Sequence, residues 1–385
     1  MWFNSYLQAA NDLLITYKGD IPFSSFLKKF FSLNKKYGST DRRYITELSY
    51  NYFRLGRSLP DASVTERILT GYFLCIERKD DLLEFFKPEW SRYAEESVER
   101  KIEFLKRFSI EEVFPWVSEL SAEMDADKFS ISFLIQPDLF LHIRRGNEIT
   151  VQQKLAAAGI SYNVISGDCI ALPNKTKIDG VITPDIEAVI QDYNSQQTIT
   201  AINPQLLNIN SPISVWDCCA GSGGKSILVK DHYPNVVLTV SDVRPSILHN
   251  LKKRFVRAGI RNYKLFIADL TSNFEFRNSK FDVIICDAPC TGSGTWSRTP
   301  EQLYFFEPHR ISYYAELQRK IVANAAKHLR ENGLFLYITC SVFKKENEDV
   351  VEFIQKNLQL HLQTQQYLKG YEKKADTLFV ALFSS

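Results

Sequence analysis

Apolar residues recur at helical spacing through the first third of the chain. Phe23, Leu27 and Phe30 lie three or four positions apart, which places their side chains on one face of a helix. Thr40 is expected to cap the next helix, and helical patterns continue over 65–106 and from 114. The pattern predicts an all-α domain over residues 1–128.

The sequence pattern changes from helical to strand-like near residue 130. Residues 131–135 and 139–143 read as strands, 151–158 as a helix, and further short strands run to about residue 172. Mixed elements of this size predict a small α/β subdomain over residues 129–200.

Strand-like and helical runs then alternate. Helices are expected after Gly224, after Pro245, across about 308–330 and after Lys345, and the strand-like runs are 213–217, 236–241, 263–268, 282–286 and 334–339. This alternation predicts a parallel, doubly wound sheet, with 378–383 as a last, antiparallel strand. The expected fold is multidomain, with a C-terminal α/β Rossmann-like domain over residues 201–385.

Composition adds a compartment and a candidate partner. No apolar run reaches the roughly 18 residues of a membrane span, and residues 1–17 lack the basic start and apolar stretch of a signal peptide, so a cytoplasmic protein without membrane contact is expected. Residues 1–60 carry nine Lys/Arg against four Asp/Glu, a local charge of +5. This excess suits a polyanion or is a solvated helix face, and charge alone leaves both open.

The chain has seven cysteines, at positions 75, 169, 218, 219, 286, 290 and 340. They form no CxxC pair and no pattern interleaved with histidines. Reduced thiols are therefore expected, with no disulfide framework and no metal site.

A glycine-rich loop follows the strand-like run 213–217. Its sequence, DCCAGSGGKS, is not a P-loop, because Cys219 stands where the first glycine is required, and Ser226 excludes the GxGxxG pattern. The next two strand-like runs end near Asp242 and Asp269, which suits contacts to the ribose hydroxyls and the adenine amine of a nucleoside cofactor without a polyphosphate. S-adenosylmethionine (SAM) fits this pattern, and simple helix caps are the alternative for the two acids.

Two cysteines, Cys290 and Cys340, each follow an apolar run. Parallel strands would deliver both thiols to the carboxyl rim of the sheet, where open α/β sheets bind ligands.

The motifs DCCAGSGGKS, DAPCTGSGT (287–295), YITCS (337–341) and QDYNSQ (191–196) resemble those of RNA cytosine-C5 methyltransferases of the RsmB/Sun type. The resemblance covers about residues 130–385. More loosely, DRRYITELSYNYFRLG (41–56) looks like the NusB-type helical domain of the bacterial ribosomal members.

The resemblance implies roles for four residues. Cys340 would add to cytosine C6 as the nucleophile, and Cys290 would assist release of the product. Asp287 would hold the N3 and N4 edge of the base, and Lys225 matches a lysine near cofactor and base. The expected cofactor site comprises Asp217, Cys219, Ala220, Gly221, Ser222, Gly223, Gly224, Lys225, Asp242, Arg244, Asp269 and Asp287.

Some residues depart from the family pattern or admit two roles. Ser222 replaces the usual proline, Thr377 stands where glycine is common, and 141–144 reads LHIR in place of Leu-Arg-Val-Asn. Arg298 suits either a phosphate contact or a salt bridge. Gln191 and Asp192 suit either positioning of the cofactor or catalytic loop or helix capping, and the cysteines expected to serve packing are Cys218, Cys219 and Cys286.

The resemblance implies a SAM-dependent enzyme that makes 5-methylcytidine in RNA. The expected substrate is a single-stranded or loop region of 16S ribosomal RNA, and the expected state is a monomer. The alternatives are a transfer RNA or DNA enzyme, an enzyme that methylates an amine and needs no thiol, and a catalytically silent RNA-binding assembly factor.

Overall fold

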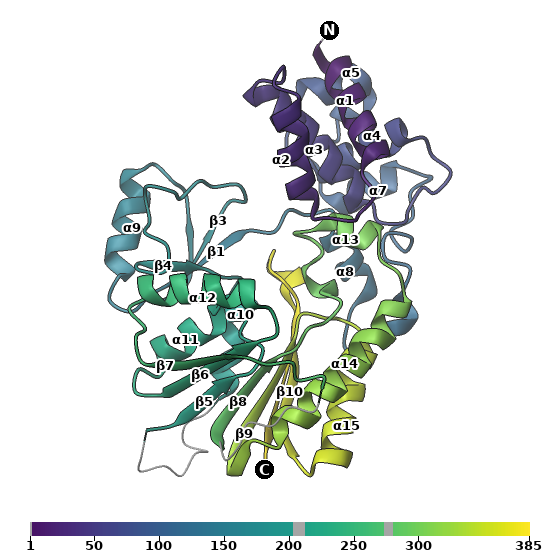
Figure 1. Ribbon diagram of the computed structural model, residues 1–385. Coiled ribbons are helices and arrows are strands. Elements are labelled where there is room, and N and C mark those ends of the chain that lie inside the picture. Colours follow the sequence, from purple (N-terminus) through teal and green to yellow (C-terminus); the bar gives the residue numbers. More distant parts are fainter. Residues whose placement is uncertain (1, 203–211, 273–279) are drawn as a thin grey trace. The chain divides into compact units, whose positions relative to one another are not determined.

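The computed structural model describes residues 2–202, 212–272 and 280–385 (Figure 1). The chain forms two compact units, one of residues 1–136 with 295–308 and one of residues 137–294 with 309–385. The three-part division at residues 128/129 and 200/201 stays a prediction. Among the described helices, none combines the length and the apolar character that crossing a membrane requires.

The first unit is helical, as predicted. Tyr17, Phe23 and Phe53 form part of its core, with the ring centroids of Phe23 and Phe53 4.9 Å apart. Its elements are α1 (Trp2–Thr16), α2 (Phe23–Leu33), α3 (Ser39–Arg54), α4 (Val64–Cys75), α5 (Asp81–Phe86), α6 (Pro88–Ser91), α7 (Val98–Phe104), η1 (Val117–Glu119), α8 (Ala126–Ser132) and α13 (Pro300–Tyr304).

Three local predictions in this unit are wrong. Helix α3 begins two residues earlier than expected, because the Gly38 N–H donates to Asp41 Oδ2 at 2.7 Å and Gly38, not Thr40, is the N-cap. The stretch 131–135 is not a strand, since Asp125 caps α8 and the helix runs through Ser132. The helix expected from residue 114 is only the short turn η1.

The second unit contains a seven-stranded sheet of order β10-β11-β9-β8-β5-β6-β7. Strands β5 to β9 pair in parallel, and β11 runs antiparallel between β9 and β10, which confirms the predicted topology. The strands are β5 (Ser214–Asp217), β6 (Val237–Asp242), β7 (Tyr263–Ile267), β8 (Phe281–Asp287), β9 (Leu329–Thr339), β10 (His361–Leu368) and β11 (Leu378–Ser384).

Helices cover both faces of this sheet (Figure 1). Leu334, Leu336 and Ile338 alternate along β9 and share one buried cluster with Ile227 and Leu251 of the helices α11 and α12, as a period of two requires. The helical elements are α10 (Tyr193–Gln197), η2 (Thr198–Ala201), α11 (Gly224–His232), α12 (Pro245–Arg257), η4 (Ser293–Thr295), α14 (His309–Ala326), η5 (Lys344–Glu346), α15 (Glu348–Leu358) and η6 (Gly370–Glu372).

The same unit holds a small antiparallel sheet of order β2-β3-β1-β4. Its elements are β1 (Leu139–Ile143), α9 (Glu148–Ala157), β2 (Asn163–Ser166), β3 (Cys169–Leu172) and β4 (Ala188–Ile190). His142 Nε2 and Arg144 Nη2 reach the Asp231 carboxylate of α11 at 3.1 and 2.6 Å. The unusual 141–144 segment therefore joins the small sheet to the Rossmann-like part.

Candidate active site

The site lies where the strand order of the large sheet reverses. Strands β5 and β8 are adjacent, yet the chain continues from β5 toward β6 on one side and from β8 toward β9 on the other. Ligands of open α/β sheets bind beyond the carboxyl ends of the strands at such a point. Asp217 ends β5, Asp287 ends β8, and Cys340 directly follows β9.

The structure brings together the two cysteines that the sequence analysis singled out. Cys290 Sγ and Cys340 Sγ lie 3.3 Å apart, and both residues are half-buried. The hydrogen bond with Cys340 and the burial of the thiol raise the pKa of Cys290 well above its usual value. Cys290 therefore keeps its proton near neutral pH, next to the other sulfur.

A single buried carboxylate joins the two cysteine loops. Glu346 accepts hydrogen bonds from the Thr291 N–H at 2.8 Å and from its hydroxyl at 2.6 Å, both one residue after Cys290. It also accepts from Ser341 Oγ at 2.7 Å, one residue after Cys340. The sequence analysis missed this role, because the partners of Glu346 come from separate segments.

Close backbone packing also holds the loop that carries Cys340. The Gly294 N–H donates to the Cys340 carbonyl at 2.9 Å, and the Thr377 N–H donates to the Gly294 carbonyl at 2.9 Å. A Cβ at position 294 would lie 2.0 Å from the Thr377 carbonyl oxygen. Only glycine fits there, so the DAPCTGSGT motif needs Gly294 for this contact.

Lys225 and Asp287 form an ion pair beside the thiols, with Nζ and Oδ2 2.7 Å apart. Burial opposes the charge on Lys225, but the Asp287 carboxylate outweighs it and raises the pKa of the ammonium group. Lys225 starts from the first turn of α11 and Asp287 from the end of β8. The pair thus joins the glycine loop to the DAPC loop.

The glycine loop combines a buried acid with backbone that leaves open space. Asp217 Oδ2 accepts from Ser226 Oγ at 2.6 Å, whereas the buried Oδ1 has no hydrogen-bond partner in the structure. Burial raises the pKa of Asp217 to about 7. Gly221 has φ +53°, and a Cβ there would meet nothing within 4 Å, so the loop leaves room beside it.

Asp242 binds the same loop from the end of β6. Its Oδ2 accepts from the Gly221 N–H at 3.0 Å, and its Oδ1 accepts from Arg244 Nε at 3.0 Å. Burial opposes the charge, but these hydrogen bonds outweigh it and lower the pKa of Asp242. Asp242 and Arg244, both predicted site residues, are therefore partners in an ion pair at the rim.

Other predicted loop residues have local contacts. The Ala220 N–H donates to the Ser241 carbonyl at 2.9 Å, and Ser222 Oγ accepts from Arg254 Nη1 at 3.1 Å. Gly223 is the N-cap of α11 with φ +85°, and Gly224 is the first residue of that helix.

Asp269 lies in an exposed position after β7. Its Oδ1 accepts from the Thr271 N–H and hydroxyl at 2.9 and 2.6 Å. These contacts fit the capping alternative for this acid.

The residues with two candidate roles have structural contacts as well. Asp192 caps α10 by accepting from the Asn194 N–H at 2.9 Å, and it also accepts from the Asp376 N–H at 2.9 Å. Gln191 Nε2 donates to Ser195 Oγ at 3.2 Å. Arg298 belongs to the helical unit, where its N–H donates to the Thr295 carbonyl.

Sequence comparison links the second unit to known methyltransferases. Residues 204–380 match the family model described as 16S rRNA methyltransferase RsmB/F. The chain is 28% identical over 239 residues to the probable ribosomal RNA small subunit methyltransferase B of Bacillus subtilis (strain 168), covering 60% of this chain and 52% of that protein. The chain is also 29% identical over 164 residues to the ribosomal RNA small subunit methyltransferase B of Shewanella oneidensis, covering 43% of this chain and 37% of that protein. The chain thus spans about half, or less, of the length of these relatives.

Solved structures share the fold. The match to the crystal structure of PH0851 covers 100% of this chain and 98% of the PH0851 chain, with a TM-score of 0.70 and 17% sequence identity. The match to the crystal structure of NSun6 from Pyrococcus horikoshii with SFG covers 70% of this chain and 96% of the NSun6 chain, with a TM-score of 0.59 and 14% sequence identity. The sequence match over residues 204–380 and the shared fold together confirm the predicted resemblance to RsmB/Sun-type RNA methyltransferases.

Proposed function

We propose that this chain is a SAM-dependent methyltransferase that makes 5-methylcytidine in RNA, with 16S ribosomal RNA as the substrate. The observation that carries the proposal is the pair of thiols 3.3 Å apart at the carboxyl ends of β8 and β9. Addition of one sulfur to a pyrimidine activates a carbon that is otherwise a poor nucleophile. A second thiol beside the first suits the release step.

The residues of the glycine loop fit SAM. Among the described residues, one buried carboxylate oxygen of Asp217 has no hydrogen-bond partner, and none of them lies within 4 Å of a Cβ placed at Gly221. The acid Asp242 at the next strand end suits ribose hydroxyls. When bound, SAM supplies a methyl group activated by a sulfonium. The chain's own part is to hold the nucleoside at these residues beside the thiols.

The chemistry on cytosine follows from the two loops. The Cys340 thiolate would form a bond to C6, and the electron pair of the C5–C6 double bond would move toward C5. Attack of C5 on the donor methyl would break its bond to the sulfonium sulfur, which would keep that electron pair and leave as a neutral thioether. Asp287, held by Lys225, would face the N3 and N4 edge, accept a hydrogen bond from the N4 amine and, once protonated, supply a hydrogen bond or proton to N3. Such assistance raises rates by about 100-fold to 10,000-fold. Loss of the C5 proton to a base then restores the double bond and breaks the S–C6 bond, with Cys290 assisting release.

Basic residues of the helical unit supply a candidate RNA contact. Lys28 and Lys29 of α2 and Arg42 and Arg43 of α3 are all exposed. Arg54 is an exception to the predicted basic face, because it is buried and donates to the Phe133 and Ser297 carbonyls at 2.7 and 2.9 Å. RNA recognised for base chemistry is single-stranded or looped, since the base must leave its stack. A monomer in the cytoplasm stays our prediction.

The proposal is tested by assaying methylation of small-subunit ribosomal RNA by variants in which one cysteine is replaced. Cys340→Ala should lose 5-methylcytidine formation, read by bisulfite sequencing, while Cys169→Ala, a buried thiol of β3, should keep it. Methylation retained by Cys340→Ala would contradict a covalent mechanism and favour an amine target. Transfer RNA assayed in parallel tests the other RNA substrate.

Calorimetry separates an enzyme from a silent assembly factor. The unaltered chain should bind SAM, and Asp242→Ala should bind it more weakly. RNA binding without SAM binding would support the silent factor, and unchanged SAM affinity in Asp242→Ala would contradict the ribose contact.

A further inference from the structure

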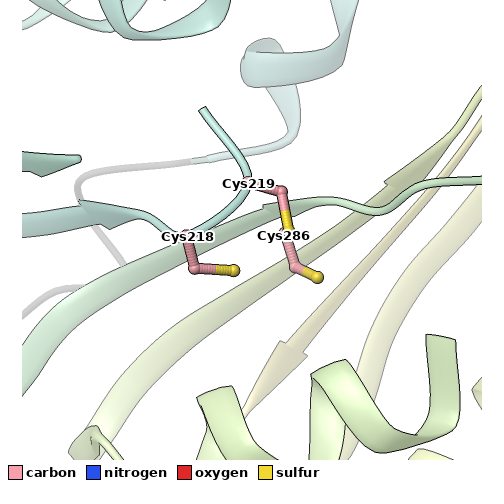
Figure 2. Close-up of side chains that lie close together, drawn as sticks. All are labelled: Cys218, Cys219 and Cys286. Carbon is pink, nitrogen blue, oxygen red and sulfur yellow. The ribbon is translucent and has the colours of Figure 1, made fainter. Parts of the chain in front are cut away.

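Three other cysteines form a cluster beneath the glycine loop. The Sγ atoms of Cys218, Cys219 and Cys286 all lie within 4.8 Å of one another, and Figure 2 shows the three side chains close together. Asp217 pairs with Ile285 in parallel register, so the residues that follow them, Cys218 and Cys286, come side by side. Cys219 adds the third sulfur from the loop.

The cluster is enclosed but can be reached. Cys218 and Cys286 are 1% and 0% exposed, whereas Cys219 is only half-buried. Among the residues that the structure describes, no histidine or carboxylate ligand atom joins the three sulfurs at the same spacing. The donor set is therefore purely sulfur, and Cys219 is the member whose residue is partly exposed.

Packing alone does not require three sulfurs at this position. These cysteines were expected to serve packing, because Cys286 lies inside a strand and Cys218 and Cys219 lie in the glycine loop, and the absence of a CxxC pattern argued against a metal site. The signal lies instead in a CC pair that ends one strand and a cysteine near the end of its parallel neighbour. Strand pairing brings these distant positions together.

We propose that Cys218, Cys219 and Cys286 bind one thiophilic d10 metal ion, of the class of Zn²⁺, Cd²⁺ and Cu⁺, through their three sulfurs. Thiolate ligands select such ions. A Zn–S bond of about 2.3 Å places sulfurs around one ion about 3.8 Å apart, so the cluster needs only small side-chain movements. Each sulfur that binds gives its proton to solvent.

The position of the cluster gives the ion a structural consequence. Cys218 and Cys219 are separated from the first loop glycine only by Ala220, and Cys286 directly precedes Asp287, which pairs with Lys225. A bound ion would fix the start of the glycine loop to the end of β8. This inference stands apart from the proposed methylation, because ion binding is measured without RNA or SAM.

Cadmium titration of the full chain tests the inference. The thiols at 290 and 340 also lie close together, so the parent protein carries Cys290→Ser and Cys340→Ser and is kept reduced by a phosphine. Titration with Cd²⁺, followed by the sulfur-to-cadmium charge-transfer absorbance and by native mass spectrometry, should give one ion per chain. Excess Zn²⁺ should displace it.

Loss of one ligand should weaken the site. Adding Cys286→Ala or Cys219→Ala to the parent should lower Cd²⁺ affinity at least about 100-fold, the upper end of the effect of altering a group that only supports a ligand. Cys169→Ala, another buried thiol, should leave the affinity unchanged. Circular dichroism checks that each variant is folded, and Cys219→Ala serves if the fully buried Cys286 proves essential for folding.

Two results would overturn the inference. One is a parent protein that binds no Cd²⁺. The other is a folded Cys219→Ala or Cys286→Ala variant that binds Cd²⁺ as tightly as the parent.

Discussion

Asp217 illustrates how one residue can make stability depend on pH. Its carboxyl group is buried, with one oxygen unpaired, and its pKa of about 7 in the folded chain lies well above the ordinary value of 3.8. The folded state therefore holds this proton more tightly than the unfolded state. The associated stability is fully present below about pH 3.8 and is lost as the pH rises from there through about 7.

We expect Asp217→Asn to flatten this dependence. In the unaltered chain the residue makes the unfolding free energy fall by up to about 1.4 kcal/mol per pH unit between 3.8 and about 7, and it contributes no slope above that range. Asparagine has no such proton. Thermal unfolding at pH 5, 6, 7 and 8 measures the effect. Asp269→Asn is the control, because hydrogen bonds to Thr271 lower the pKa of this exposed acid, so it contributes a pH slope only at acidic pH. Equal slopes in Asp217→Asn and the unaltered chain would contradict the assignment.

Single residues differed in how far the sequence revealed them. Cys290 and Cys340 could be placed together, because each follows an apolar run that a parallel sheet carries to the same rim. The position of Asp242 after β6 had the same basis. The ion pair of Lys225 with Asp287 could not be predicted, since it depends on side-chain positions across two loops.

At the scale of helices and strands, contacts between elements hold the two thiols in their geometry. Each cysteine lies on a loop after a strand, and loops are held by the contacts that they make. Glu346, at the end of η5, accepts from Thr291 and Ser341, which follow the two cysteines, and from Gln318 of α14 at 3.1 Å. Burial of this carboxylate raises its pKa, and the converging donors offset part of that cost.

We therefore expect Glu346→Gln to loosen both loops at once. An amide NH₂ would face the hydroxyl donors, so the unfolding free energy should fall by about 2 kcal/mol and methylation should fall with it. Thermal unfolding and a methylation assay measure the two effects.

Glu352→Gln on the exposed side of α15 is the matched control. Glu352 is exposed and pairs with the exposed Lys356, and changes at such surface positions alter stability by less than about 0.5 kcal/mol. If Glu346→Gln behaved like this control, the carboxylate would not hold the loops.

Elements with strong apolar runs were predictable and polar ones were not. The parallel strands β5 to β9 and the antiparallel β11 were expected, because each carries an apolar run. These runs are buried in all of them except the edge strand β7, whose residues are half-buried or exposed. Strand β10, with the sequence HLQTQQYL, is mostly exposed at the sheet edge, and its polar residues hide it. The apolar segment 131–135 was predicted as a strand, although its first residues end helix α8. Phe129 and Phe133 are spaced as on one face of a helix, with ring centroids 4.9 Å apart.

At the scale of the whole molecule, residues 295–308 belong to the helical unit although in the sequence they lie between segments of the second unit. The Phe23 N–H donates to Glu301 Oε1 at 3.2 Å, and the Tyr52 and Tyr304 hydroxyls lie 3.1 Å apart. Such contacts between distant segments leave no local pattern in a single sequence, so this grouping could not be predicted.

The charge of the helical unit leads to a prediction for RNA binding. Neutralising Lys28, Lys29, Arg42 and Arg43 together to glutamine should weaken RNA binding. The salt dependence should also fall, by about 0.7 in the slope of log affinity against log salt for each lost phosphate contact on single-stranded RNA. Filter binding across a salt series measures both.

The control removes the same charge from the other unit, through glutamine at the exposed Lys252, Lys253, Lys327 and Lys356. An equal loss of affinity in this control would show that net charge, and not the helical unit, determines binding.

The most direct measurement of the proposed chemistry is trapping of the covalent adduct between protein and RNA. Cys290→Ala should add to cytosine through Cys340 but release the product slowly, because it lacks the thiol that lies 3.3 Å from the nucleophile. With RNA and SAM it should give a protein–RNA band on a denaturing gel, and this band should vanish when Cys340→Ala is added. An adduct formed by Cys340→Ala and not by Cys290→Ala would reverse the roles of the two cysteines. If neither Cys290→Ala nor Cys340→Ala formed an adduct, the result would contradict the covalent mechanism.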